Sequence, residues 1–132
     1  MLVEIEIPQG ESEFTVQAAL YLLEALVSIK REIMRRDAPP ALYDTPGPLY
    51  RQEPPGKERF DNITKFSERG WADCDDLAAA RVAELREGGE LGAKCQVVWP
   101  KGQRRYHARV LRENGTTEDP CIVLLKRERN RK

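Results

Sequence analysis

The longest periodic pattern of apolar positions lies in the first third of the chain. Between Phe14 and about Arg36, apolar residues recur three or four positions apart, which is the spacing of one face of an α-helix. This face comprises Val16, Leu20, Leu23, Val27, Ile29, Ile33 and Met34. Four basic residues, Lys30, Arg31, Arg35 and Arg36, complement the helix dipole at its carboxyl end. We predict a helix over residues 14–36, broad enough in its apolar face to pack partly on a second subunit.

Shorter patterns flank this helix. Residues 2–7 alternate apolar and acidic side chains and predict a strand or an extended arm. Six prolines and one glycine between residues 37 and 55 predict a long connector with a short extended piece at residues 49–52. Its length favours a functional or partner-facing loop. A second, short helix is predicted around residues 60–69, ended by Gly70.

Signals for both ends of a third helix are present between Asp73 and Gly88. The Asp73 carboxylate can accept the free amide hydrogens of the first turn, and Asp76 completes an acidic capping box. The helix is predicted to run to about Arg86 and to stop at Gly88-Gly89. One face, which must point at the protein body, comprises Cys74, Ala78, Val82 and Leu85.

Beyond Gly92 the apolar period changes to two. Strands are predicted over residues 94–99, 104–112 and 116–125, joined by turns, as an antiparallel meander. Helices followed by strands predict the α+β class, with the helices on one face of the sheet. The 132 residues suit a single domain. Within it we distinguish residues 1–48 (arm, helix and connector), a core over 49–125 and a basic tail over 126–132.

The composition of the chain limits the binding partners and the cellular compartment that we expect for it. Lys plus Arg and Asp plus Glu both number 22, so charge does not favour nucleic acid or an anionic membrane as a partner. The amino end carries acids where a signal peptide would carry bases, and no apolar run reaches the length of a membrane span. Three cysteines without CxxC spacing predict free thiols. We therefore expect a protein of the cytoplasm.

Three residues have the order and spacing of a catalytic triad. Cys74 falls in the first turn of the predicted third helix, the only histidine, His107, on a predicted strand, and Asp119 shortly after it. A cysteine hydrolase needs such a nucleophile, base and orienting acid. The helix dipole favours the Cys74 thiolate, but Asp75 and Asp76 oppose it, although we expect their main role to be complementing the dipole.

The triad requires one particular strand register. A two-residue turn after the His107 strand would pair Val110 with Asp119 and place Asp119 on the face opposite His107. A three-residue loop ending in a left-handed Gly115 pairs Arg109 with Asp119 instead. Asp119 then lies diagonal to His107 on the same face. The hypothesis depends on this second register.

The oxyanion formed during acyl transfer needs hydrogen-bond donors. The backbone amide of Cys74 is one candidate because it lies at a helix amino terminus. For the second donor the sequence offers only the Gln52 side chain and the Trp71 indole.

The other cysteines suggest alternatives. Cys95 and Cys121 are predicted to be packing residues in strands, with Cys121 a rival nucleophile because it would sit opposite His107. A zinc site formed by Cys74, Cys95, Cys121 and His107 has the right number of ligands but lacks paired ligand spacing and a knuckle glycine. No metal or other cofactor is therefore expected.

Five short motifs occur together between residues 49 and 125. They are Tyr50-Arg51-Gln52-Glu53-Pro54-Pro55-Gly56, Arg59-Phe60-Asp61-Asn62, Gly70-Trp71-Ala72-Asp73-Cys74-Asp75-Asp76-Leu77-Ala78, Tyr106-His107-Ala108-Arg109-Val110 and Glu118-Asp119-Pro120. This set resembles the transglutaminase-like cysteine proteins encoded by tailed bacteriophages and prophages. The resemblance implies Cys74 as nucleophile, His107 as base and Asp119 as orienting acid. It also implies a papain-like α+β core, to which the long N-terminal helix is an addition.

The same resemblance implies a function. It favours a phage-type thiol protease or amidase that forms an acyl-enzyme with a peptide or protein substrate, in virion assembly or as a virion component. The superfamily also includes acyl transferases and inactive members. A transglutaminase therefore remains an alternative, as does a non-enzymatic virion module with a relic triad. In that module the helix of residues 14–36 would contact phage structural proteins or a second copy of the chain.

Overall fold

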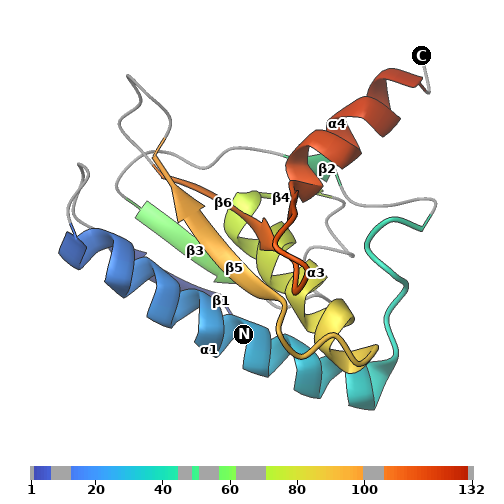
Figure 1. The fold of residues 1–132 in the computed structure, drawn as a ribbon, viewed down its shortest axis with the longest axis horizontal. Helices are drawn as coiled ribbons and strands as arrows, with labels where there is room; N and C mark the ends of the chain where they lie inside the picture. The colour runs from blue at the N-terminus through green and yellow to red at the C-terminus, as the bar shows by residue number, and fades with distance from the viewer. Residues whose placement is uncertain are drawn as a thin grey trace.

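The computed structural model describes residues 2–6, 13–44, 49–50, 57–61, 71–99 and 106–130. Its elements, in chain order, are β1 (Leu2–Glu6), α1 (Glu13–Asp37), β2 (Leu49–Tyr50), β3 (Lys57–Asp61), β4 (Trp71–Ala72), α3 (Cys74–Glu87), β5 (Lys94–Val98), β6 (His107–Leu111), β7 (Thr117–Glu118) and α4 (Pro120–Asn130) (Figure 1). The predicted α+β class is confirmed.

The described strands form three small sheets. Strands β5, β6 and β7 make an antiparallel sheet with β6 in the middle, β1 pairs antiparallel with β3, and β2 pairs in parallel with β4. The prediction of a strand near the amino end is confirmed by β1. The prediction of a helix over residues 60–69 is wrong at its start, because Phe60 and Asp61 pair with β1. The rest of that segment, residues 62–69, lies outside the described residues.

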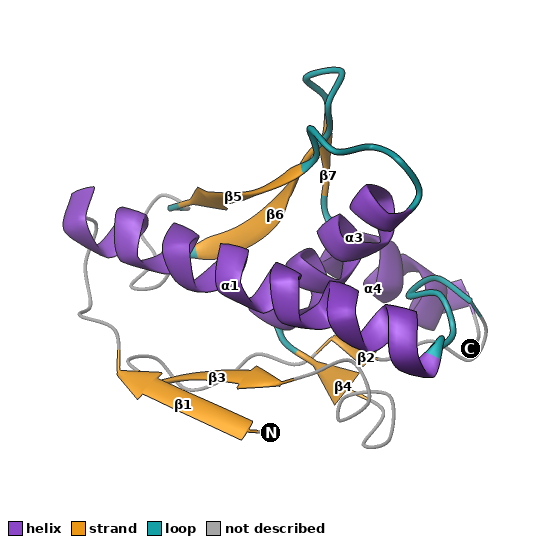
Figure 2. Cartoon of the chain, turned by 90° about the horizontal axis from the view of Figure 1, so that it is seen from below, coloured by secondary structure: helices purple, strands orange, loops and turns teal. Residues whose placement is uncertain are grey.

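Helix α3 lies at the centre of the molecule. It packs against α1 and β6, while α1 also contacts β5. In the view of Figure 2, the β5–β6 sheet and the β1–β3 pair lie on opposite sides of α1. Four fully buried alanines on α3, Ala78, Ala79, Ala80 and Ala83, let its neighbours approach the helix axis closely. Leu77 and Val82 complete the buried surface, each contributing about 1.5–3 kcal/mol by burial.

Both ends of α3 were predicted correctly. The Asp73 carboxylate accepts a hydrogen bond from the backbone N–H of Asp76 at 3.4 Å, which satisfies one of the free amides of the first turn. At the other end Gly88 caps the helix and donates its N–H to the carbonyl of Glu84. These caps fix where α3 begins, and hence where Cys74 lies.

The buried face of α1 differs in part from the prediction. Its fully or nearly fully buried residues are Thr15, Ala19, Leu23, Leu26, Val27 and Lys30. Ile29, placed on the apolar face by the sequence, is 41% exposed, whereas the charged Lys30 is buried.

At the surface, Arg86 of α3 forms a bidentate ion pair with Glu24 of α1, a contact of small energetic value because it is solvated. No helix in the described ranges combines the length and apolar character needed to cross a membrane.

The prediction of a strand over residues 116–125 is confirmed at its start by β7 and is wrong after Glu118. Strand β7 ends at Glu118, and α4 begins at Pro120. Asp119 caps this helix, because its carboxylate accepts from the backbone N–H of Cys121 at 3.0 Å and its carbonyl accepts from Val123. Proline has no N–H to continue a sheet ladder and suits the first position of a helix. Residues 126–130 of the predicted basic tail belong to α4.

Candidate functional site

The strand register brings His107 and Asp119 to the same face. Gly115 closes the loop after β6 with a φ of 90°, as the three-residue loop requires. Val110 lies opposite Glu118, so the next step along both strands carries Asp119 towards His107. The predicted register is therefore confirmed, and the two-residue turn is excluded.

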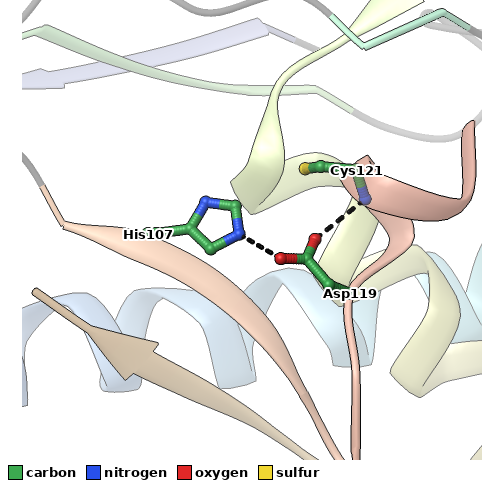
Figure 3. A group of neighbouring side chains, drawn as sticks. All are labelled: His107, Asp119 and Cys121. Carbon is green, nitrogen blue, oxygen red and sulfur yellow. Dashed lines mark hydrogen bonds and ion pairs between the residues drawn. The ribbon is translucent and has the colours of Figure 1, made fainter. Parts of the chain in front are cut away.

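A short hydrogen bond joins the imidazole to the carboxylate. His107 Nε2 lies 2.6 Å from Asp119 Oδ2, and both side chains are mostly buried (Figure 3). Burial opposes ionisation of Asp119, but the hydrogen bond and charge of His107 and the amides of Ile122 and Cys121 outweigh it and lower its pKa. An ionised carboxylate can only accept, so Nε2 must carry a proton. In the neutral ring Nδ1 is then the free acceptor.

The candidate nucleophile Cys74 is 7% exposed at the start of α3. Burial raises the pKa of its thiol well above the ordinary value, the carboxylates of Asp75 and Asp73 raise it further, and a hydrogen bond with the backbone of Ala108 lowers it only in part. The helix dipole and the neighbouring acids are expected from the sequence to have opposite effects on the Cys74 pKa. Burial and the acids outweigh the dipole, and the pKa is raised. The resting form of Cys74 is the thiol, and ionising it requires a base.

The backbone at Ala108 reaches the thiol because β7 is short. If β7 continued in its register, position 120 would stand opposite Ala108. Residue 120 is instead a proline that opens α4, so Ala108 has no strand partner on that edge and its backbone bonds the Cys74 thiol. Ala108 is fully buried, and its small side chain lets α3 approach β6. The thiol therefore lies beside the residue that follows His107.

A buried hydrogen bond also ties the two halves of the site together. The Tyr106 hydroxyl donates to the Asp75 carboxylate at 3.0 Å, and both residues are buried. Tyr106 precedes His107 in the chain, and Asp75 follows Cys74, so this bond holds α3 against β6 next to both candidate residues. Asp73, Asp75 and Asp76 are predicted from the sequence to cap α3 and to complement its dipole. The cap is confirmed for Asp73, whereas the contact of Asp75 with Tyr106 has no counterpart in the prediction.

A second thiol belongs to the same neighbourhood. The Sγ of Cys121, a nitrogen of His107 and a carboxylate oxygen of Asp119 all lie within 4.8 Å of one another. Burial, followed by the charge of Asp119, raises the pKa of the Cys121 thiol. Cys121 was predicted to lie in a strand and instead lies in α4, yet its predicted closeness to His107 is observed. It is a genuine rival to Cys74 as the thiol of this site.

The remaining cysteine is not part of this group. Cys95 lies in β5, and burial raises its pKa to about 12. All three cysteines are free thiols, as expected. Among the described residues, the group able to ligate a metal is His107, Asp119 and Cys121, without Cys74 or Cys95. The four-ligand zinc set considered from the sequence is therefore not assembled.

The two candidates for the second oxyanion donor stay untested. Gln52 and the side chain of Trp71 lie outside the described residues. The backbone nevertheless brings their segments together, because Tyr50 lies opposite Ala72 in the parallel β2–β4 pair. The connector therefore meets the chain two residues before Cys74.

A scan against models of protein families matches nothing, and searches of curated proteins and of solved structures give no match either.

Proposed function

We propose that this protein is a cysteine hydrolase that cleaves peptide or amide bonds through an acyl-enzyme on Cys74. The observation that carries the proposal is the 2.6 Å bond between His107 and Asp119, made one residue from the backbone that bonds the Cys74 thiol. Asp119 is well held for this purpose, since it also caps α4. A papain-like arrangement of helix and sheet, as the sequence resemblance implies, is consistent with this geometry.

The chemistry follows from the proton positions. His107 Nδ1 removes the thiol proton as the Cys74 sulfur attacks the substrate carbonyl, and Asp119 stabilises the imidazolium that forms. The imidazolium then gives the proton to the leaving amine, and the C–N bond breaks to leave a thioester. A water molecule, deprotonated by His107, attacks the thioester and releases the acid and the thiol. The backbone N–H of Cys74, at the start of α3, is the available oxyanion donor.

Burial of the thiol adds a constraint on this mechanism. Because the Cys74 pKa is raised, a preformed thiolate–imidazolium pair is not the resting state. Proton transfer must accompany attack on the carbonyl, as in general-base catalysis. The rate should therefore depend strongly on His107.

The biological setting proposed here rests on the sequence resemblance alone. It favours a phage-encoded enzyme that processes a protein during virion assembly, or remains in the virion, with a peptide or protein as substrate. The exposed residues of α1, among them Tyr21 and Ile29, would then be available to phage structural proteins or a second copy.

Acylation by an activated ester tests the proposal without knowledge of the natural substrate. The intact protein is mixed with p-nitrophenyl acetate at neutral pH, and its mass and the released nitrophenol are followed. We expect one acetyl group, on Cys74, and its loss in Cys74→Ser but not in the matched Cys95→Ser variant. Faster deacylation by an added primary amine than by water would indicate acyl transfer rather than hydrolysis. Failure to acylate Cys74 would reject catalysis and leave a structural virion module.

A further inference from the structure

We propose that Cys121, His107 and Asp119 form a binding site for a zinc-class divalent cation, and that the bound cation switches off the hydrolase. The metal site stands on the geometry of these three side chains. Its inhibitory effect rests on the function proposed above.

The three side chains offer the donor set that zinc prefers. A thiolate sulfur, an imidazole nitrogen and a carboxylate oxygen are its ordinary ligands in proteins, and three protein ligands with one open position are common. Donor atoms that share one tetrahedral ion stand about 3–4 Å apart. Here all three lie within 4.8 Å of one another, so modest side-chain rotation brings them to a common ion. The 2.6 Å contact of His107 with Asp119 must lengthen as the cation enters between them.

Part of the site is already held in place. The second carboxylate oxygen of Asp119 accepts from the Cys121 backbone N–H, which fixes the first oxygen facing His107 (Figure 3). That bond supports the carboxylate in the way that outer hydrogen bonds commonly support metal ligands. Cys121 follows Asp119 by two positions in the first turn of α4, so one capped helix end carries two of the three ligands.

Cation binding changes the protonation of two of the three ligands. The cation replaces the Nε2 proton of His107, which moves to Nδ1, and the ring stays neutral. The Cys121 thiol loses its proton to solvent and binds as thiolate. Asp119 exchanges a hydrogen bond from Nε2–H for a metal–oxygen bond. One proton is therefore released for each cation bound.

This exchange removes the base. Hydrolysis needs Nδ1 of His107 free to accept the Cys74 proton, and that requires the proton to sit on Nε2, facing Asp119. A cation on Nε2 requires the opposite tautomer, with Nδ1 protonated. The imidazole then has no lone pair for the thiol. Metal occupancy and Cys74 catalysis therefore exclude each other, although Cys74 is not a ligand.

Cobalt binding tests the site directly. Co²⁺ reports a thiolate ligand through a sulfur-to-metal charge-transfer absorption. The full chain is titrated with Co²⁺, and Zn²⁺ is then added to displace it. We expect a single Co²⁺ site with a charge-transfer band. In Cys121→Ser the band should disappear and the affinity should be at least about 100-fold lower. In Cys95→Ser the band should persist. Asp119→Asn, which preserves the helix cap, provides a second variant with weakened binding.

The outcomes are decisive for the site. A charge-transfer band of unchanged strength in Cys121→Ser, or its absence from the folded wild-type protein, would overturn the proposal. So would Zn²⁺ that binds without releasing a proton. If Cys121→Ser does not fold, Asp119→Asn and the proton count answer the same question.

Inhibition is tested on a second readout. Acylation of Cys74 by the activated ester is measured with saturating Zn²⁺ and again after chelation. Each variant is compared with its own metal-free rate. We expect Zn²⁺ to suppress acylation in the wild type and in Cys95→Ser, and to have a much smaller fractional effect in Cys121→Ser. Acylation that is unaffected by bound Zn²⁺ overturns the inhibitory claim. If the metal-free protein is not acylated at all, the hydrolase proposal fails while the Co²⁺ spectrum still decides the metal site.

Discussion

Replacing Asp119 by asparagine separates the two roles of this residue. Its carboxylate orients His107 and also caps α4 through the backbone N–H of Cys121. Asparagine caps a helix about as well as aspartate, so Asp119→Asn keeps the helix cap and loses only the charge that faces His107. Alanine removes the cap as well and should cost about 1 kcal/mol. The pair of variants thus isolates the charge.

The expected loss of reactivity follows from the contact. A hydrogen bond to a charged partner contributes about 1.5–3 kcal/mol, and the His107–Asp119 bond is of this kind, at 2.6 Å and mostly buried. Asp119 stabilises the imidazolium formed when the Cys74 proton is taken. At about 1.4 kcal/mol for each factor of ten, acylation of Cys74 should slow by about 10- to 150-fold. The asparagine amide can also donate to Nε2 and favour the wrong tautomer, which adds to the loss.

The assay is the rate of acylation of Cys74 at neutral pH, with unfolding by urea measured on the same samples. Asp37→Asn, at an exposed position at the end of α1, is the matched control and should behave as the wild type. Wild-type rates in a folded Asp119→Asn variant would refute the reasoning. So would an equal loss of stability in the asparagine and alanine variants.

Three further substitutions test the surroundings of the site. Tyr106→Phe removes the hydroxyl that donates to buried Asp75, so the free energy of unfolding should fall by about 1–3 kcal/mol. Tyr21→Phe, at a residue 74% exposed, is the control and should have no measurable effect. Similar values for the two variants would argue against a buried bond. Hydrogen bonds from the Arg112 guanidinium lower the pKa of Glu90 from 4.5 to about 2. Between these pH values the unfolded chain binds more protons than the folded protein, so stability falls as pH falls. In Glu90→Gln this part of the slope should disappear from urea unfolding measured between pH 2 and 5, and an unchanged slope would contradict the assignment. Ala108→Val should overpack the contact between β6 and α3, lower the free energy of unfolding by about 1–3 kcal/mol and slow the acylation of Cys74. A variant with wild-type stability and acylation rate would contradict close packing at this contact.

Much of the site could be predicted because its signals are local. The start of α3 follows from Asp73, a capping residue just before an alanine-rich run. The pairing of β6 with β7 follows from the glycine at position 115 and the length of the loop before it. Once these two local features are fixed, the common face of His107 and Asp119 follows from strand alternation.

The errors have two physical sources. Residues 116–125 are rich in strand-forming side chains, and this pattern was given more weight than Asp119-Pro120, the cap and first position of a helix. Other features depend on contacts between distant segments. Burial of Lys30 and the bond of Tyr106 with Asp75, 31 residues apart, arise only when α1, α3 and β6 pack together. No local sequence pattern contains that information.

The state of the single histidine tests the central claim most directly. Because the chain has one histidine, ¹⁵N-labelled histidine gives one pair of ring-nitrogen signals. We predict that Nε2 carries a proton, which it donates to Asp119, and that the Nδ1 signal shifts when Cys74 is alkylated. An Nε2 without a proton in the metal-free protein, or an Nδ1 signal unaffected by modification of Cys74, would contradict this prediction.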